Sequence, residues 1–64
     1  MLFSVTSRGG ATRLVARERD GMFEYEMEDG SWGQYKTLES LRNAVRIKIA
    51  LGYFGKQYKV EGEL

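Results

Sequence analysis

The sequence predicts a single α+β domain over residues 1–64, in which an antiparallel β-meander of three to four strands packs on one α-helix and a short C-terminal strand forms an edge (β-β-β-β-α-β). Short segments of alternating apolar and polar residues, separated by glycine-containing turns, indicate the strands. One long segment with apolar residues at helical spacing indicates the helix. A chain of this size buries only about 60% of the surface of its unfolded form, so the core must be small.

The first two predicted strands, 2–7 and 13–19, flank a turn at Gly9–Gly10. Adjacent glycines adopt the positive φ angles that a two-residue hairpin turn requires. The two strands should therefore pair antiparallel and place their apolar residues on one face of the sheet. The register set by this turn pairs Val5 with Leu14 and Phe3 with Ala16.

The turn at Asp20–Gly21 joins the second strand to a central strand over residues 22–28. Asp-Gly is a strong signal for a two-residue hairpin, and its register agrees with that of the first turn. Opposite charges then meet across the outer face of the sheet. The predicted inner pairs are Ala16 with Tyr25 and Leu14 with Met27, and the predicted outer pairs are Arg17 with Glu24 and Arg13 with Glu28.

The third turn contains Asp29–Gly30 and precedes a strand over residues 32–36. A two-residue loop and a three-residue loop are both compatible with this turn. We favour the three-residue loop because it keeps aromatic rings on the inner face and pairs charges on the outer face. The two-residue loop pairs Tyr25 with Gln34, whereas the favoured loop, 29–31, pairs Tyr25 with Tyr35 and Glu24 with Lys36 and points Trp32 and Gln34 outward.

The helix is predicted over residues 38–51. Thr37 precedes it as an N-cap, Glu39 lies in the first turn where the helix dipole favours an acid, and Gly52 follows it as a residue suited to positive φ. Apolar residues recur at intervals of three and four, which indicates one face packed on the sheet. The residues of this face are Leu38, Leu41, Val45 and Ile49.

A second apolar stripe lies on the flank of the predicted helix and consists of Ala44, Ile47 and Leu51. We favour a tail that folds back over this stripe, and the tail residues that would cover it are Tyr53, Phe54, Tyr58 and Val60. The alternative is an exposed patch that serves a homodimer or another partner. Residues 57–61 alternate again and predict a last edge strand, whose neighbour in the sheet the sequence does not identify.

The composition excludes several classes of function. Histidine and cysteine are both absent, which removes the usual general base, the Ser-His and Cys-His nucleophile pairs, and thiolate metal sites. We therefore predict a protein that is not an enzyme and has no cofactor or metal. The formal net charge is only +1, so no global field attracts nucleic acid or an anionic membrane. No apolar run approaches the roughly 20 residues of a membrane span, and Met1–Val5 lacks the features of a signal peptide, so we expect a cytoplasmic protein.

Three acidic residues, Glu24, Glu26 and Glu28, point the same way along the central strand, about 7 Å apart. Carboxylates at such distances can serve glycoside hydrolysis or bind a hard cation. Both uses need a cleft or a wrapping loop, and the middle of a small flat sheet offers neither. We favour neutralisation across the strands by Arg13, Arg17 and Lys36.

The predicted three-stranded meander is followed by one helix, and the segment contains Trp32-Gly33-Gln34-Tyr35, Thr37, Glu39, Ala44 and Gly55. This pattern resembles the small integrase N-terminal domains and the plant ethylene-response-factor domains, which bind DNA. The resemblance implies nucleic-acid contacts from the outer sheet face, by Arg13, Arg17, Arg19, Trp32 and Lys36. The sequence departs from those domains in its acidic central strand, which would repel phosphates.

The other hypothesis is a protein-interaction module that binds a larger protein stoichiometrically and occludes its surface. An exposed tryptophan near arginine is the composition expected of an interface hot spot. Small chains without catalytic residues resemble in character the inhibitors that phages and mobile elements encode, such as anti-CRISPR proteins. The acidic central strand favours this hypothesis over nucleic-acid binding. The predicted contact residues are Arg17, Arg19, Glu24, Glu26, Trp32 and Gln34.

Overall fold

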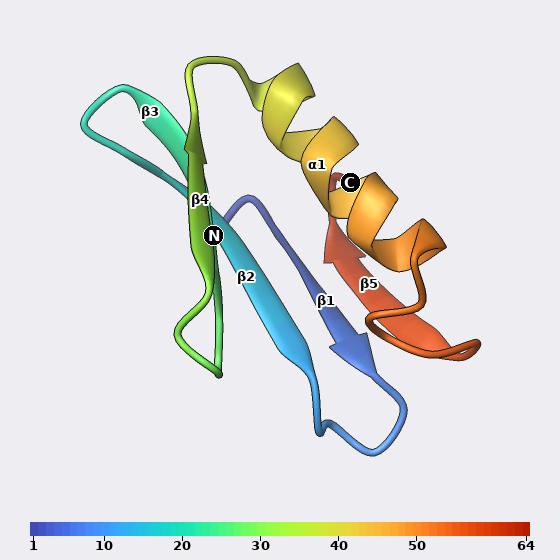
Figure 1. Ribbon diagram of the computed structural model, residues 1–64. Helices are drawn as coiled ribbons and strands as arrows, with labels where there is room; N and C mark the ends of the chain where they lie inside the picture. Colours follow the sequence, from blue (N-terminus) through green and yellow to red (C-terminus); the bar gives the residue numbers. More distant parts are fainter.

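The computed structural model describes all residues, 1–64, as a five-stranded antiparallel sheet with one helix against one of its faces (Figure 1). The strand order across the sheet is β4-β3-β2-β1-β5. This arrangement confirms the predicted α+β fold, including its C-terminal edge strand. The elements are β1 (Phe3–Ser7), β2 (Arg13–Arg19), β3 (Met22–Met27), β4 (Trp32–Tyr35), α1 (Leu38–Ala50) and β5 (Tyr58–Gly62).

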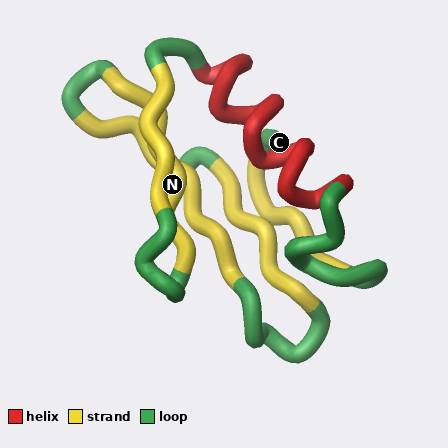
Figure 2. Tube along the Cα trace, viewed as in Figure 1, coloured by secondary structure: helices red, strands yellow, loops and turns green.

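Strand β5 pairs antiparallel with β1, at the edge of the sheet opposite β4. Figure 2 shows α1 on one face of the sheet, between the end of β4 at one edge and the start of β5 at the other. The helix carries the chain back along the strands, so that β5 enters the sheet parallel to β4 and antiparallel to its neighbour β1.

The core lies between α1 and the inner face of the sheet, and it confirms the registers predicted from the first two turns. Phe3 lies opposite Ala16, and Leu14 lies between Val5 and Met27. Two residues of the predicted helix face, Leu41 and Val45, are fully buried against them. The complete core consists of Phe3, Val5, Leu14, Ala16, Tyr25, Met27, Leu41, Val45 and Phe54.

The third hairpin adopts neither of the two predicted registers. Tyr25 lies opposite Gly33, whereas the favoured prediction placed it opposite Tyr35 and the alternative opposite Gln34. Tyr35 instead pairs with Phe23. The favoured register was wrong by two residues, so it still assigned each side chain to the correct face. The outer pairs are Glu24 with Gln34 and Glu26 with Trp32, and the predicted pair of Glu24 with Lys36 is wrong.

The physical reason is the position of the loop, which is Glu28–Gly30. The Gly30 amide donates to the Met27 carbonyl at 3.0 Å, and the Met27 amide donates to the Ser31 carbonyl at 2.8 Å. Gly30 has a φ of +92°, which glycine adopts without strain. A tight turn followed by a glycine of positive φ is the common three-residue hairpin loop. The Asp29 carboxylate stabilises it further by accepting the Ser31 amide at 2.8 Å.

This register also gives the Tyr25 ring a place to lie. The ring packs over Gly33, where an added Cβ would lie 2.5 Å from the Tyr25 Cε2 atom. The Tyr25 and Tyr35 rings stack with their centroids 6.4 Å apart, and the Lys48 ammonium lies 5.3 Å from the Tyr25 centroid. An aromatic ring that covers a cross-strand glycine stabilises a sheet register.

Helix α1 begins and ends as its flanking residues predict. The Thr37 hydroxyl accepts the Ser40 amide at 3.1 Å, as an N-cap does. At the other end, the Gly52 amide donates to the Ile49 carbonyl and the Tyr53 amide to the Lys48 carbonyl, at 3.0 and 3.2 Å. This pair of bonds is the Schellman motif, and the φ of +90° at Gly52 permits it.

The prediction that the tail covers the second helix stripe is wrong. Ile47 and Leu51 are 60% and 71% exposed, and Ala44 is half-buried. Residues 58–62 instead pair with β1 at the edge of the sheet opposite β4. There they lie beside the flank of the helix that faces away from this stripe. Of the tail aromatic residues, only Phe54 returns to the core, where it is 2% exposed.

We expect the substitution Gly33→Ala to lower the free energy of unfolding by about 1–3 kcal/mol, because the new methyl group would overlap the buried Tyr25 ring. Urea denaturation measures the change. Gln34→Ala is the matched control, since it alters an exposed residue of the same strand and should have little effect. Equal stability of the two variants would contradict the register of this hairpin.

Candidate functional site

The face of the sheet opposite α1 carries most of the candidate residues, and no element covers it (Figure 1). We call it the charged sheet face. It is formed by the outward residues of β2, β3 and β4. These residues are Arg13, Val15, Arg17, Arg19, Met22, Glu24, Glu26, Trp32 and Gln34.

The strand ladder arranges these side chains in rows across the sheet. Arg17, Glu24 and Gln34 form one row. Val15, Glu26 and Trp32 form the next, and Trp32 ends that row on the edge strand β4, where it is 62% exposed. All six residues of the predicted protein contact therefore lie on one continuous surface, with Arg19 at the end of β2.

The charges on this face pair differently from the prediction. The register places Arg17 directly opposite Glu24, as predicted, but the ion pair forms on the diagonal, between Arg19 Nε and Glu24 Oε1 at 3.2 Å. Long side chains reach diagonal neighbours across an antiparallel pair. Arg13, Arg17 and Lys36 have no carboxylate oxygen within 4.0 Å, so the predicted neutralisation by these three residues, including the pair of Arg13 with Glu28, is wrong.

Glu24 is largely enclosed for a charged group, with a side chain only 14% exposed. Its Oε1 atom is buried and accepts no hydrogen bond, although Arg19 Nε lies 3.2 Å away, because the two groups are not aligned as donor and acceptor. The ion pair therefore offsets the negative charge of Glu24, but its Oε1 atom still accepts no hydrogen bond. A buried acceptor in this condition costs free energy that a better aligned donor would recover.

A hollow of about 240 Å³ lies on the same face, beside the row that ends at Trp32. Two arginines and two glutamates surround an apolar floor, so the hollow offers both signs of charge to a side chain that enters it. The sequence did not indicate this hollow, because its lining comes from two neighbouring strands. Which side chains surround Val15 follows only from their positions across the sheet. The lining residues are Arg13, Val15, Arg17, Glu26, Met27 and Glu28.

The sequence suggested that Trp32 lies beside arginine, and the structure shows that it does not. Its cross-strand neighbour is Glu26, and the arginines lie on β2, beyond the acidic strand β3. The predicted nucleic-acid contacts are therefore split: Arg13, Arg17 and Arg19 lie on one strand, and Lys36 follows the far strand β4.

The structure adds two residues of β5 to this face that the sequence could not place. Glu61 lies opposite Ser4, which lies opposite Val15, and Lys59 lies opposite Thr6 in the next row. The alternation in 57–61 indicated that Lys59 and Glu61 share a face, but not which strand they join.

No group of three or more acidic side chains comes close enough to hold a metal ion. The hydrogen bonds from Ser31 hold the pKa of the Asp29 carboxyl below its usual range, and this group belongs to the hairpin loop. The helix is neither long nor apolar enough to cross a membrane. Comparisons of the chain with protein-family models, with curated proteins and with solved structures find no match.

We expect a double-mutant cycle of Arg19→Met and Glu24→Gln to give a coupling free energy of about 0.2–1 kcal/mol, as exposed or partly exposed ion pairs do. The matched cycle of Arg17→Met and Glu24→Gln should give a coupling close to zero, since no ion pair joins these residues. Urea denaturation of each variant at low salt measures both values. Stronger coupling to Arg17 than to Arg19 would contradict the diagonal pair.

Proposed function

We propose that the protein is a non-enzymatic interaction module that binds a larger protein stoichiometrically and occludes part of its surface, in the manner of small inhibitors encoded by phages and mobile elements. The observation that carries the proposal is Trp32, a large side chain that is 62% exposed on an uncovered sheet face. A large aromatic side chain provides much contact area at a small cost in conformational entropy.

The charges around Trp32 support a protein partner. Glu26 and Gln34 lie next to it, and Arg17 lies one row and two strands away. A protein surface can present complementary groups of both signs, and such a pattern fixes the orientation of a complex. The proposed contact residues are Arg17, Arg19, Glu24, Glu26, Trp32 and Gln34.

Trp32→Ala should weaken binding of the partner by at least about 30-fold, which corresponds to a hot-spot loss of about 2 kcal/mol or more. The immobilised protein is used to capture partners from a lysate of the cells that produce it, and the captured protein is titrated with each variant by isothermal calorimetry. Tyr53→Ala is the matched control, because Tyr53 is an exposed aromatic residue outside the charged sheet face. Equal losses for the two variants would exclude Trp32 as the anchor.

Nucleic-acid binding through Arg13, Arg17, Arg19, Trp32 and Lys36 is the second candidate. It is favoured by one observation, that Arg13, Arg17 and Lys36 have no acidic partner within 4.0 Å and keep their charge available. It is opposed by Glu24 and Glu26, which lie between the arginines and Trp32 and would repel phosphates.

Glu26→Lys separates the two candidates, because it has opposite effects on them. It should weaken a protein complex that uses Glu26, and it should tighten binding to nucleic acid by removing a repulsive charge. Fluorescence anisotropy with mixed duplex and single-stranded oligonucleotides, over a series of salt concentrations, measures the second effect. We expect no binding at low salt by the wild-type protein. Binding whose logarithm falls linearly with the logarithm of salt concentration would instead support a nucleic-acid site.

Two further expectations stay predictions from the sequence. One is a cytoplasmic location. The other is a homodimer through Ala44, Ile47 and Leu51, for which the exposure of Ile47 and Leu51 leaves the required surface accessible.

A further inference from the structure

Strand β5 is an edge strand whose five residues are all exposed, and its outer side has no neighbour. An unpaired edge of this kind can pair with another strand, and proteins often block it with charged side chains. In β5 the two charged side chains have opposite signs. Lys59 and Glu61 flank Val60, and their charged groups lie 3.9 Å apart on the charged sheet face.

The backbone hydrogen bonds show which groups of β5 remain unpaired. The Arg8 amide donates to the Gln57 carbonyl, and the Glu63 amide donates to the Leu2 carbonyl. Since hydrogen-bonded pairs alternate along an antiparallel ladder, the backbone groups of Lys59 and Glu61 face β1. The backbone groups of Tyr58, Val60 and Gly62 therefore point away from the sheet.

A second copy of β5 fits these free groups in one antiparallel register. If Val60 pairs with Val60 of the second copy, the outward backbone groups of Tyr58 face those of Gly62 in the other chain. Lys59 then lies directly opposite Glu61 of the second copy, twice by symmetry, at the close spacing of a pair without backbone hydrogen bonds. Moving the twofold axis by one residue in either direction, which shifts the register by two residues, would instead place Lys59 opposite Lys59 or Glu61 opposite Glu61, which repel.

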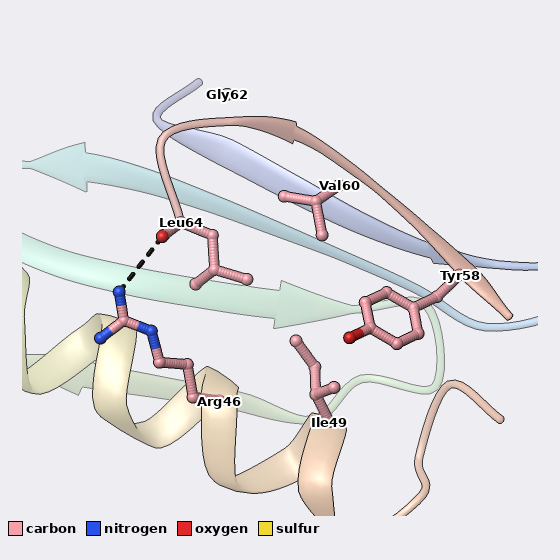
Figure 3. A pocket seen from close by; sticks show the side chains of 6 residues that line it. All are labelled: Arg46, Ile49, Tyr58, Val60, Gly62 and Leu64. Atoms are coloured by element: carbon pink, nitrogen blue, oxygen red, sulfur yellow. Dashed lines mark hydrogen bonds between the residues drawn. The ribbon is translucent and has the colours of Figure 1, made fainter. Parts of the chain in front are cut away.

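The inner side of β5 also lacks cover. A groove of about 360 Å³ separates α1 from β5, and Figure 3 shows Ile49 of the helix pointing toward Tyr58 and Val60 of the strand. Tyr58 and Val60 are 44% and 39% exposed in this groove. In the register centred on Val60, the grooves of the two copies meet at the symmetry axis, so Val60 and its neighbours shield one another from water.

We propose that two copies of this chain form a homodimer through β5, around a twofold axis at Val60, and so build one continuous ten-stranded sheet. The partner is a second copy because the charge pattern of β5 complements itself. The axis is perpendicular to the sheet, so both charged sheet faces lie on the same side of the dimer. This surface differs from the helix stripe of Ala44, Ile47 and Leu51, which lies on the opposite flank of α1. The interface is short, so the dimer should be weak and dependent on concentration.

Charge reversal tests the proposal, because each single variant opposes itself but complements the other. Sedimentation equilibrium between about 5 and 500 μM should show that the wild type dimerises, and that Lys59→Glu and Glu61→Lys each associate at least about tenfold more weakly. An equimolar mixture of the two variants should dimerise at least as tightly as the wild type. Circular dichroism verifies that each variant is folded. The Lys59→Glu, Glu61→Lys double variant should regain the wild-type dimer.

Several results would overturn the proposal. These are a wild type that stays monomeric at about 500 μM, single variants that dimerise as the wild type does, or a mixture that does not associate. Loss of the dimer in Ile47→Asp together with its retention in Lys59→Glu would assign the interface to the helix stripe.

Hydrogen exchange of the wild type provides a second test that needs no variant. The amides of Lys59 and Glu61 should be protected at every concentration, since they face β1. The amide of Val60 should gain protection only as the concentration rises. A Val60 amide whose exchange is independent of concentration would exclude β5 as the interface.

Discussion

One helix of 13 residues can cover only one face of a five-stranded sheet, and this limit determines the rest of the structure. The covered face supplies most of the nine-residue core. No second layer packs on the other face, which stays in contact with water and carries the charges of β2 and β3. Both edges of the sheet, β4 and β5, stay open as well. The candidate binding surfaces are the regions that the helix leaves uncovered.

The local parts of the fold could be predicted from the sequence, and the nonlocal parts could not. Asp20–Gly21 sets a register that the ladder confirms, because a two-residue turn fixes its own pairing. The register predicted from Gly9–Gly10 is also confirmed, but the loop is wider than a two-residue turn, since the Gly10 amide donates to the Ser7 carbonyl. The third register was wrong, since it depends on the Tyr25 ring meeting Gly33, a contact between residues eight positions apart. The neighbour of β5 could not be predicted, because both edges of the meander, β1 and β4, were free and no tight turn links β5 to either of them.

The candidate site shows the same division. Alternation along the strands assigned Arg17, Glu24 and Trp32 to one face, and the structure places them there. The partners of the charges were not predictable, because long side chains choose between direct and diagonal neighbours. Glu24 thus pairs with Arg19 rather than with Arg17. The self-complementary charges of β5 were visible in the sequence, and so was its place at an edge, but only the pairing with β1 shows which backbone groups of β5 stay free.

Quenching of tryptophan fluorescence by acrylamide tests most directly whether the charged sheet face is uncovered and serves as the contact surface. Trp32 is the only tryptophan, so the emission reports this face alone. We predict that the free protein emits like tryptophan in water and is readily quenched, and that a bound protein partner protects Trp32 while oligonucleotides do not. Shielded emission in the free protein, or a bound partner that leaves quenching unchanged, would contradict the account.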